Sequence, residues 1–272
     1  PVALTRGSCA FGSPMTDTER PTPWLEFKLC LGLLTRVPVT LKGRIPAHAM
    51  AWASRWFPVV GALVGGVSAI VLCVCVWLGI PNTAAALLAI GAGILFTGAL
   101  HEDGLADTAD GFGGGFDAPA RLEIMRDSRI GTYGVLALIF SIGLHWWALI
   151  ALLSMSLQAA VVSLIVAGAV SRVTPVWLMY ALTPARPDGM AVDAGKPELR
   201  TIYVASALAL TSLLLLSTWL PMVLVILVTL AVFAGIGALS VRRIGGQTGD
   251  VLGAGQQLTE ILVLVALATV GS

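Results

Sequence analysis

Charged residues are scarce in this sequence of 272 residues. Asp, Glu, Lys and Arg make up 11% of the chain, hydrophobic residues make up 57%, and the mean hydropathy is +0.91. Soluble domains carry about 25% charged residues, so the deficit excludes an ordinary soluble protein. The apolar segments are also too many for a signal peptide or a single anchor. The composition therefore predicts an integral membrane protein whose partner is the lipid bilayer.

Cysteine pairs, excess charge and internal repeats are also missing. None of the four cysteines has the spacing of a metal ligand, and Cys73 and Cys75 lie in an apolar run, where cysteine behaves as a small hydrophobe. We expect no structural disulfide. The net charge of +1 gives no indication of a nucleic-acid partner. Residues 1–22 are polar and rich in Pro, Ser and Thr, which predicts a disordered leader, and residues 23–272 are predicted to form one helical catalytic domain.

Seven apolar segments are present, and each is close to the roughly 17 to 25 residues that cross a bilayer as a helix. Residues 24–39 precede them and are too short and too charged to span, which favours an amphipathic helix at the membrane interface. The predicted fold is an all-α, polytopic membrane bundle of about seven transmembrane helices plus this N-terminal helix. The seven segments are residues 57–80, 83–100, 131–153, 157–182, 199–219, 221–240 and 251–270.

The connections between these segments alternate in charge. Those after the first, third and fifth segments contain no charged residue, whereas the leader and the connections after the second, fourth and sixth hold nearly every charge. Seven crossings place all the charged connections on one face, and the positive-inside rule makes that face cytoplasmic. We therefore expect an inner-membrane protein with a site facing the cytoplasm and a carboxyl terminus on the opposite side.

Three of the aspartates in the connection after the second segment, Asp103, Asp107 and Asp110, are spaced i, i+4 and i+7. On a helix these residues lie within about 60° of one another. Acids on one stripe repel unless a cation lies among them, and oxygen ligands suit Mg²⁺ or Mn²⁺. The alternative is a solvated acidic face, which nearby glycines such as Gly113 and Gly114 disfavour because glycine permits close approach to a ligand. The pattern predicts catalytic aspartates around Mg²⁺.

The same connection continues with a second set of charges. Glu123 and Asp127 are spaced i, i+4 and are expected to face the aspartates as further metal ligands. Arg126 and Arg129 are spaced i, i+3, and their guanidinium groups match phosphate oxygens, so they are candidate catalytic residues. The alternative for any one pair is a surface salt bridge.

Two other charged connections are expected to reach the same face. The proline-rich connection at residues 183–198 holds Arg186, which is a candidate contact for an anionic substrate unless the connection is only flexible. Gly245 and Gly246 precede a helix start at Asp250, and amides at a glycine-rich helix start form an anion site. The alternative is that Asp250 only caps that helix.

Two ionisable residues, Arg172 and Glu260, fall inside apolar segments. Each lies roughly 13 to 17 Å inside its predicted helix end, so their depths match and their charges are opposite. An ionisable residue within a membrane is a functional candidate by default. The sequence predicts that the two are partners, either in the site or in a structural ion pair.

Four stretches resemble cobalamin synthase, the adenosylcobinamide-GDP ribazoletransferase family. They are LTRVPV at residues 34–39, HEDGLADTADGFGGG at 101–115, RLEIMRDSRIGTYG at 121–134 and GGQTGDVLGAGQQLTE at 245–260. The resemblance implies a polytopic enzyme that joins adenosylcobinamide-GDP to α-ribazole or its 5′-phosphate. It also implies release of GMP, a requirement for Mg²⁺ and a late step of coenzyme B12 biosynthesis. A homo-oligomer or association with other cobalamin-assembly enzymes is a further expectation.

The candidate site can be stated residue by residue from these motifs. Glu102 joins the metal set of Asp103, Asp107, Asp110, Glu123 and Asp127. The candidate substrate-binding residues are His101, Gly113, Gly114, Arg36, Arg186, Gly245, Gly246, Thr248 and Asp250.

Three other functions compete with this interpretation. Asp107-Thr-Ala-Asp110-Gly111 resembles the opening of the CDP-alcohol phosphotransferase motif and Glu123-x-x-x-Asp127 its closing acidic pair, but the Ala-Arg that follows the glycine in that motif is missing. A transporter would often show an inverted repeat, and none is visible. A non-catalytic scaffold would not need the aspartate stripe. The nucleotide released, GMP or CMP, would distinguish the two enzymes.

Overall fold

The computed structural model describes residues 20–41, 45–216 and 218–270, and within them the chain is built from helices with no β-sheet. One isolated bridge joins Pro184 to Gln247. The predicted leader lies outside the described residues except for its last three positions. There Thr22 accepts a hydrogen bond at its hydroxyl from the amide of Leu25, 3.3 Å away, and caps the first helix, α1 (Pro23–Leu34).

All seven predicted apolar segments are helical. They contain α3 (Phe57–Trp77), α4 (Asn82–Thr97), α7 (Thr132–Met155), α8 (Leu157–Ser171) with α9 (Val173–Ala181), α11 (Leu199–Ser212) with η3 (Leu213–Leu215), α12 (Trp219–Ile244) and α13 (Gly249–Val270). The shorter helices lie between them: α2 (Ala49–Ala53), η2 (Ser54–Trp56), α5 (Leu100–Gly114), α6 (Ala118–Ile124) and α10 (Met190–Ala194).

The number of full-length spans is smaller than the predicted seven. By length and composition, five helical stretches of the described chain can each cross a membrane: Ala49–Trp77, Thr132–Met155, Leu157–Ala181, Trp219–Ile244 and Gly249–Val270. Helix α4 counts as a sixth only together with α5, from which it is bent by 89°. The fifth predicted span is the shorter helix Leu199–Leu215. The described chain therefore holds five or six full-length spans, and Leu199–Leu215 is the shorter helix that would make the predicted seventh.

The bend between α4 and α5 directs the acidic helix into the bundle. Two consecutive residues, Gly98 at φ 69° and Ala99 at φ 60°, adopt left-handed backbone conformations. Glycine accepts this conformation readily, whereas alanine does so at an energetic cost. Gly98 is also needed for space, because a Cβ there would collide with the guanidinium of Arg36. The break lets α5 pack along α13 and α7 instead of continuing α4.

The core of the bundle is formed where small residues let helices approach closely. A Cβ on Gly61 of α3 would collide with the carbonyl of Gly168 in α8, and one on Gly65 would collide with the carbonyl of Leu164. Such close contacts are typical of helix pairs in membranes, where van der Waals packing drives association.

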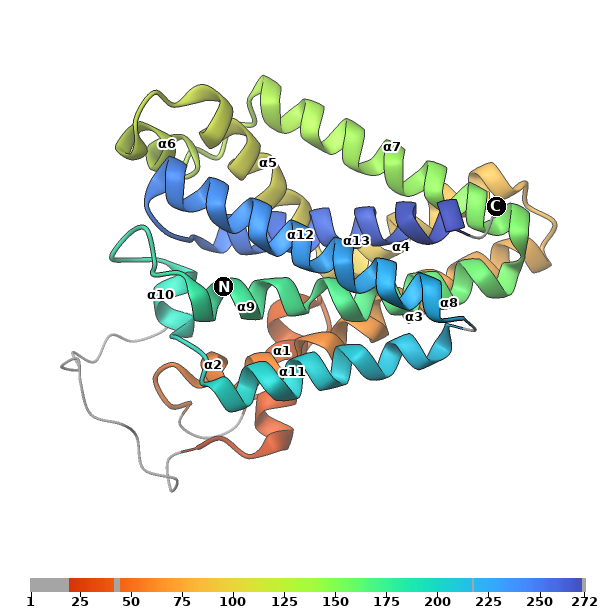
Figure 1. Ribbon diagram of the computed structural model, residues 1–272, viewed down its shortest axis with the longest axis horizontal. Coiled ribbons are helices and arrows are strands. Elements are labelled where there is room, and N and C mark those ends of the chain that lie inside the picture. Colours follow the sequence, from red (N-terminus) through yellow and green to blue (C-terminus); the bar gives the residue numbers. More distant parts are fainter. Residues whose placement is uncertain (1–19, 42–44, 217, 271–272) are drawn as a thin grey trace.

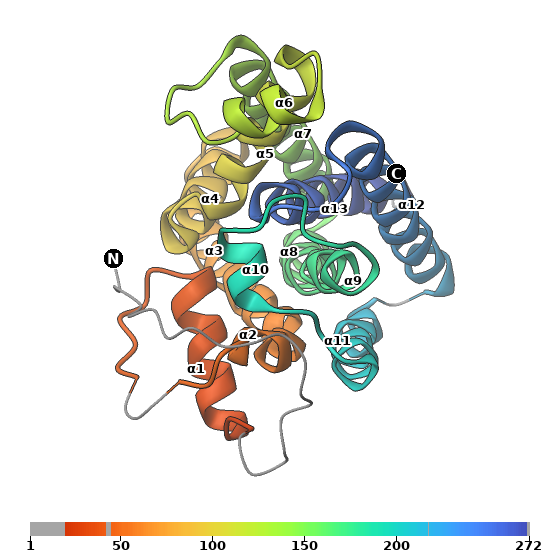
Figure 2. The same cartoon turned by 90° about the vertical axis from the view of Figure 1, so that its left-hand side faces the viewer.

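The charged connections lie together. Figure 1 shows the turns from α3 to α4 and from α7 to α8 at one end of the bundle, and α5, α6 and α10 at the other. Figure 2 views that second end, where α10 lies beside α8 and α9, and α6 lies next to α5. The alternation read from the sequence is therefore present as a polar end and an apolar end.

Candidate active site at the charged end of the bundle

Helices α5 and α13 touch at glycines, and this contact brings carboxylates together. A Cβ on Gly104 would lie 2.8 Å from the carbonyl oxygen of Asp250 and 3.3 Å from the Cα of Gly253. Because the backbones meet there, Asp103 of α5 and Asp250 of α13 lie on facing helices and line one cavity. The glycines of the predicted motifs thus serve helix packing next to the acids.

Three carboxylates, Asp103, Asp107 and Asp250, form what we call the acid cluster. Asp107 interacts electrostatically with both of the others and with Arg186. Arg186 also lies 3.5 Å from a carboxylate oxygen of Asp250. In the described part of the chain, the carboxylates of Asp103 and Asp107 have no hydrogen bond or ion pair. The cluster therefore has more negative charge than its one arginine balances, and such a set attracts a cation.

Asp110, the third aspartate of the predicted stripe, is engaged differently. Its carboxylate accepts hydrogen bonds from the backbone amides of Gly131, at 2.7 Å, and Gly134, at 2.8 Å. The residue is only 7% exposed, and a Cβ on either glycine would press against the carboxylate. An anion at these amides satisfies donors at the start of α7 and favours its dipole. The stripe is thus divided into two cluster residues and one helix-capping residue.

The second set of charges lies outside the acid cluster. Arg129 donates to both carboxylate oxygens of Asp127, at 2.6 and 3.1 Å, and these hydrogen bonds lower the pKa of Asp127 to about 2. Arg126 pairs with Asp188, and Glu123 is exposed. The structure therefore shows salt bridges at these positions, which was the alternative interpretation. Glu123 is exposed, Asp127 is held by Arg129, and neither residue lines the cavity beside the acid cluster.

The glycine-rich turn between α12 and α13 is occupied by backbone contacts. Gly245, at φ 77°, ends α12 and donates to the carbonyl of Val241. Gly246 has no room for a Cβ against the carbonyl of Thr183, and Gln247 donates to that same carbonyl at 2.9 Å. These contacts fix the turn against the connection that holds Arg186. The turn thereby positions Arg186 next to Asp250.

Thr248, and not Asp250, caps α13. The Thr248 hydroxyl accepts from the amide of Val251 at 3.3 Å and lies 3.1 Å from a carboxylate oxygen of Asp250. Capping by Thr248 leaves the Asp250 carboxylate free to face Arg186 and α5. The cap at Thr248 explains why the carboxylate of Asp250 is available for the predicted site. The sequence alone did not indicate which of the two residues caps the helix.

The other candidate residues take varied positions. His101 is buried and lines the cavity beside the acid cluster, whereas the neighbouring Glu102 lines a second, smaller cavity with Arg172 and Glu260. Arg36 donates to the carbonyl of Gly98 at 3.5 Å and so contacts the end of α4. Gly113 and Gly114 are packing positions against the ring of Tyr133 and the side chain of Ile124.

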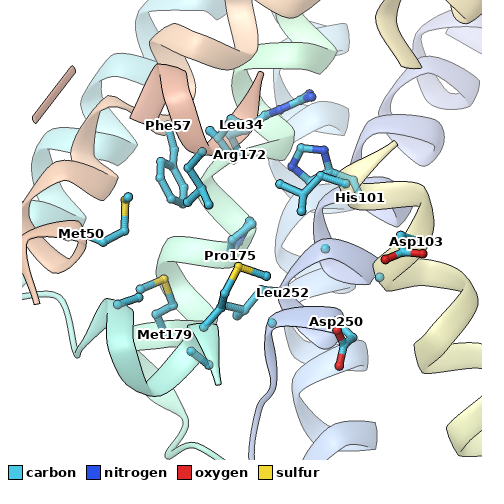
Figure 3. Close-up of a pocket in the computed structure, with 18 residues that line it drawn as sticks. Leu34, Met50, Phe57, His101, Asp103, Arg172, Pro175, Met179, Asp250 and Leu252 are labelled. Atoms are coloured by element: carbon cyan, nitrogen blue, oxygen red, sulfur yellow. The ribbon is translucent and has the colours of Figure 1, made fainter. Parts of the chain in front are cut away.

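The cavity beside the acid cluster has two unlike sides. The inner space of the cavity is about 110 Å³, and it widens to about 770 Å³ when the open mouth is included. Figure 3 shows Asp103 and Asp250 on one side and Met50, Phe57 and Met179 on the other. The apolar side is contributed by α1, α2, α3, α9 and α10, and its side chains are Leu33, Leu34, Met50, Phe57, Pro175, Met179, Met190, Ala191 and Ala194.

Sequence reasoning missed the apolar side because its residues come from five separate helices. Each residue taken alone resembles ordinary core or lipid-facing sequence. The methionines, Met50, Met179 and Met190, are the available signal, since methionine is common at adaptable binding surfaces.

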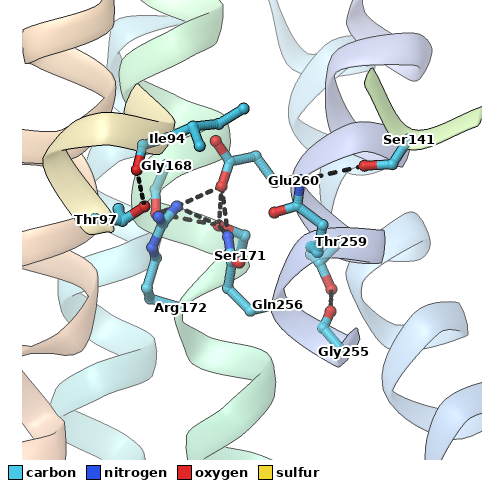
Figure 4. Close-up of polar contacts among 11 residues, drawn as sticks. Ile94, Thr97, Ser141, Gly168, Ser171, Arg172, Gly255, Gln256, Thr259 and Glu260 are labelled. Atoms are coloured by element: carbon cyan, nitrogen blue, oxygen red, sulfur yellow. Dashed lines mark hydrogen bonds and ion pairs between the residues drawn. The ribbon is translucent and has the colours of Figure 1, made fainter. Parts of the chain in front are cut away.

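Arg172 and Glu260 are partners, as predicted. Arg172, 2% exposed, donates to Glu260 at 2.5 Å, to the Gly168 carbonyl at 3.2 Å and to the Ser171 hydroxyl at 3.0 Å. Gln256 donates to Glu260 and to Ser171 (Figure 4). Arg172 also lines the cavity, so this pair lies beneath it and links α8 and α9 to α13.

These features define a class of protein: a polytopic helical membrane protein with a carboxylate-rich cavity at the charged end of its bundle. Sequence comparison then gives the family. The model of the cobalamin-5-phosphate synthase family matches residues 26–268, and the chain belongs to this family.

Relatives with curated names agree with the family. The adenosylcobinamide-GDP ribazoletransferase of Allorhizobium ampelinum is 41% identical over 245 residues, which cover 88% of this chain and 94% of that protein. The protein of the same name from Bradyrhizobium diazoefficiens is 43% identical and covers 94% of this chain and 97% of its own length. That of Azorhizobium caulinodans is 49% identical and covers 77% and 81%. No solved structure matches the chain.

Proposed function

We propose that this protein transfers the adenosylcobinamide-phosphate group of adenosylcobinamide-GDP to α-ribazole or its 5′-phosphate. A ribose hydroxyl attacks the phosphorus that carries cobinamide, the bond to the bridging oxygen breaks, and GMP leaves with that oxygen. The product is adenosylcobalamin or its 5′-phosphate. Family membership supports the reaction, and the acid cluster beside an open cavity is the observation that supports its location.

Phosphoryl transfer of this kind requires positioning and charge neutralisation more than covalent chemistry. Asp103, Asp107 and Asp250 are the residues we propose to hold Mg²⁺, since carboxylate oxygens are its preferred protein ligands. When bound, Mg²⁺ would neutralise charge on the diphosphate. In the described residues no three such side chains are already grouped as metal ligands, although the donor chemistry fits. Asp110 is left out of this set because two backbone amides already engage its carboxylate.

Arg186 is the basic residue that we place closest to the diphosphate. It lies between the two helices of the acid cluster, interacting with Asp107 and Asp250. A guanidinium fork matches two phosphate oxygens, so Arg186 would hold the departing GMP phosphate. Arg126 and Arg129 pair with Asp188 and Asp127, which lie outside the acid cluster, and this position suits gathering the anionic substrate at the mouth.

We also propose that the charged end faces the cytoplasm of an inner membrane. Arginine and lysine are concentrated at that end, and the positive-inside rule places such an end in the cytoplasm. A diphosphate substrate would then reach the acid cluster from water without crossing lipid. A reporter fused after Ser272 reads as periplasmic if this orientation is right.

Incubation of the purified protein in lipid nanodiscs with adenosylcobinamide-GDP, α-ribazole and Mg²⁺ tests the reaction directly. We expect a cobalamin product and equimolar GMP. Release of CMP from a CDP-alcohol, with no cobalamin product, would instead support the lipid-headgroup enzyme. A chelator added before substrate should stop product formation, and restored Mg²⁺ should recover it.

A further inference from the structure

The two sides of the cavity suit different chemical groups, and this asymmetry extends the proposed function. The acid cluster can hold only a charged, metal-associated group. The opposite side presents Met50, Phe57, Met179 and Met190 with no charged side chain among them (Figure 3). An apolar surface held at the edge of a reaction site gains free energy when an apolar group covers it.

Three groups of the substrates are candidates for this side. The corrinoid is far larger than the inner space of the cavity, which is about 110 Å³. Guanine carries an amine, a carbonyl and a ring N–H on its edges, and burying these against methionine and phenylalanine leaves them without partners. The base of α-ribazole is a flat benzimidazole with two methyl groups and one free ring nitrogen. Only this base combines a suitable size with an apolar edge.

We infer that the apolar side of the cavity is the binding site for the dimethylbenzimidazole base of α-ribazole. The inference rests on the proposed function. The base packs against Phe57 and the methionines of α2, α9 and α10, with its ribose directed toward Asp103 and Asp250. A ribose hydroxyl is then presented to the diphosphate at the acid cluster.

Polar atoms at the inner end of the cavity fit the free ring nitrogen of this base. His101 and Arg172 both line the cavity, on the side where Figure 3 shows them above Pro175. In the described part of the chain, no hydrogen bond joins the imidazole of His101 to another group, and the buried Nε of Arg172 has no partner. Buried donors without partners are uncommon, and a ring nitrogen would accept from one of them.

A substitution in α10 tests the inference without disturbing the bundle. Ala194 lines the cavity from this short helix, and Ala194→Phe would place a phenyl ring on the apolar side. We expect the KM for α-ribazole to rise about 10-fold or more, the scale on which a pocket rejects excess volume, with little change in the KM for adenosylcobinamide-GDP. Val192→Phe adds the same ring to the same helix at a position that does not line the cavity, and should leave both KM values unchanged.

Several results would overturn the assignment. A rise in the KM for adenosylcobinamide-GDP alone would place guanine in the cavity. Unchanged KM values in Ala194→Phe would mean that neither base enters the cavity. Equal effects of Val192→Phe would show that the change comes from displacement of α10.

If wild-type protein forms no product, the proposed reaction fails. Calorimetry of α-ribazole binding to metal-free protein then still tests the cavity, because binding that Ala194→Phe weakens supports the site and absent binding refutes it.

A comparison of two ribosides tests the inference on wild-type protein, without relying on the folding of a variant. The riboside of benzimidazole lacks the two methyl groups but keeps the ring and the ribose. Each buried methyl contributes a factor of about four in affinity, so the analogue, which lacks two, should bind wild-type protein about 15-fold more weakly. In Ala194→Phe the difference in affinity between the two ribosides should be smaller. Equal binding of the two ribosides to wild-type protein would show that the methyl groups stay in water, contrary to the inference.

Discussion

The acid cluster and the Arg172–Glu260 pair are neighbouring charged groups in opposite states. Arg172 and Glu260 are buried, and their partners are supplied by α8 and α13. Asp103 lines the cavity and Asp107 interacts electrostatically with Asp103, and no group in the described chain forms a hydrogen bond or ion pair with either carboxylate. A protein rarely retains adjacent unpaired carboxylates for stability, because they repel each other. The comparison indicates that the first region serves ligand binding and the second serves the fold.

The largest effect should come from the acid cluster and should be confined to activity. Asp107→Asn keeps the shape of the side chain but removes one charge from the proposed metal site. We expect turnover to fall by a factor of at least about 10³, which corresponds to roughly 4 kcal/mol of activation free energy. Thermal stability should be unchanged or slightly higher, because repulsion within the cluster decreases. Product formation and the unfolding midpoint in nanodiscs measure both effects, and wild-type turnover would remove Asp107 from the site.

The buried pair should show the converse behaviour. Glu260→Gln leaves the Arg172 guanidinium buried without its counter-charge, which we expect to cost on the order of 3 kcal/mol of unfolding free energy. The double variant Arg172→Met with Glu260→Met removes both charges and should recover much of that stability. Thermal unfolding of the purified variants provides the measurement. A double variant no more stable than Glu260→Gln would show that the two residues are not energetically coupled.

Asp110 sharpens the comparison because it shares a helix face with Asp107 but has the contacts of a structural residue. An asparagine there keeps one oxygen for the amides of Gly131 and Gly134 and turns an N–H group toward the other amide. Loss of that hydrogen bond should lower stability by about 1 to 2 kcal/mol. The fall in turnover should be smaller than that of Asp107→Asn. If Asp110→Asn instead abolished turnover with full stability, Asp110 would belong to the metal set.

The fold was more predictable than the site, for physical reasons. Apolar segments, alternating charge and the matched depths of Arg172 and Glu260 depend on local composition. The segments are helices, the charged connections share one end of the bundle, and the two buried residues are partners, as predicted. The stripe of three aspartates was also correct as helix geometry. The different role of Asp110 depends on a contact across the fold, the hydrogen bonds from amides at the start of α7. The availability of Asp250 depends on the cap that Thr248 provides. The apolar side of the cavity joins five helices, and no local pattern could reveal it.

The smallest effect should come from the exposed arginine Arg129, and it tests where the site ends. Its side chain is 87% exposed and its partner Asp127 lies on the same turn, so water already screens the pair. Arg129→Gln should leave the unfolding midpoint unchanged and raise the KM for adenosylcobinamide-GDP only slightly, since one positive charge is lost from the mouth. Arg186→Gln, made in parallel, should raise that KM far more, because Arg186 lies at the acid cluster.

Salt titration separates the two roles. Screening should abolish the small effect of Arg129→Gln, while much of the Arg186→Gln effect should persist because close and partly buried charges are screened less. If Arg129→Gln lost as much turnover as Asp107→Asn, the α6–α7 connection would have to close over the reacting phosphate. Arg129 would then belong to the reaction site and not to the mouth of the cavity.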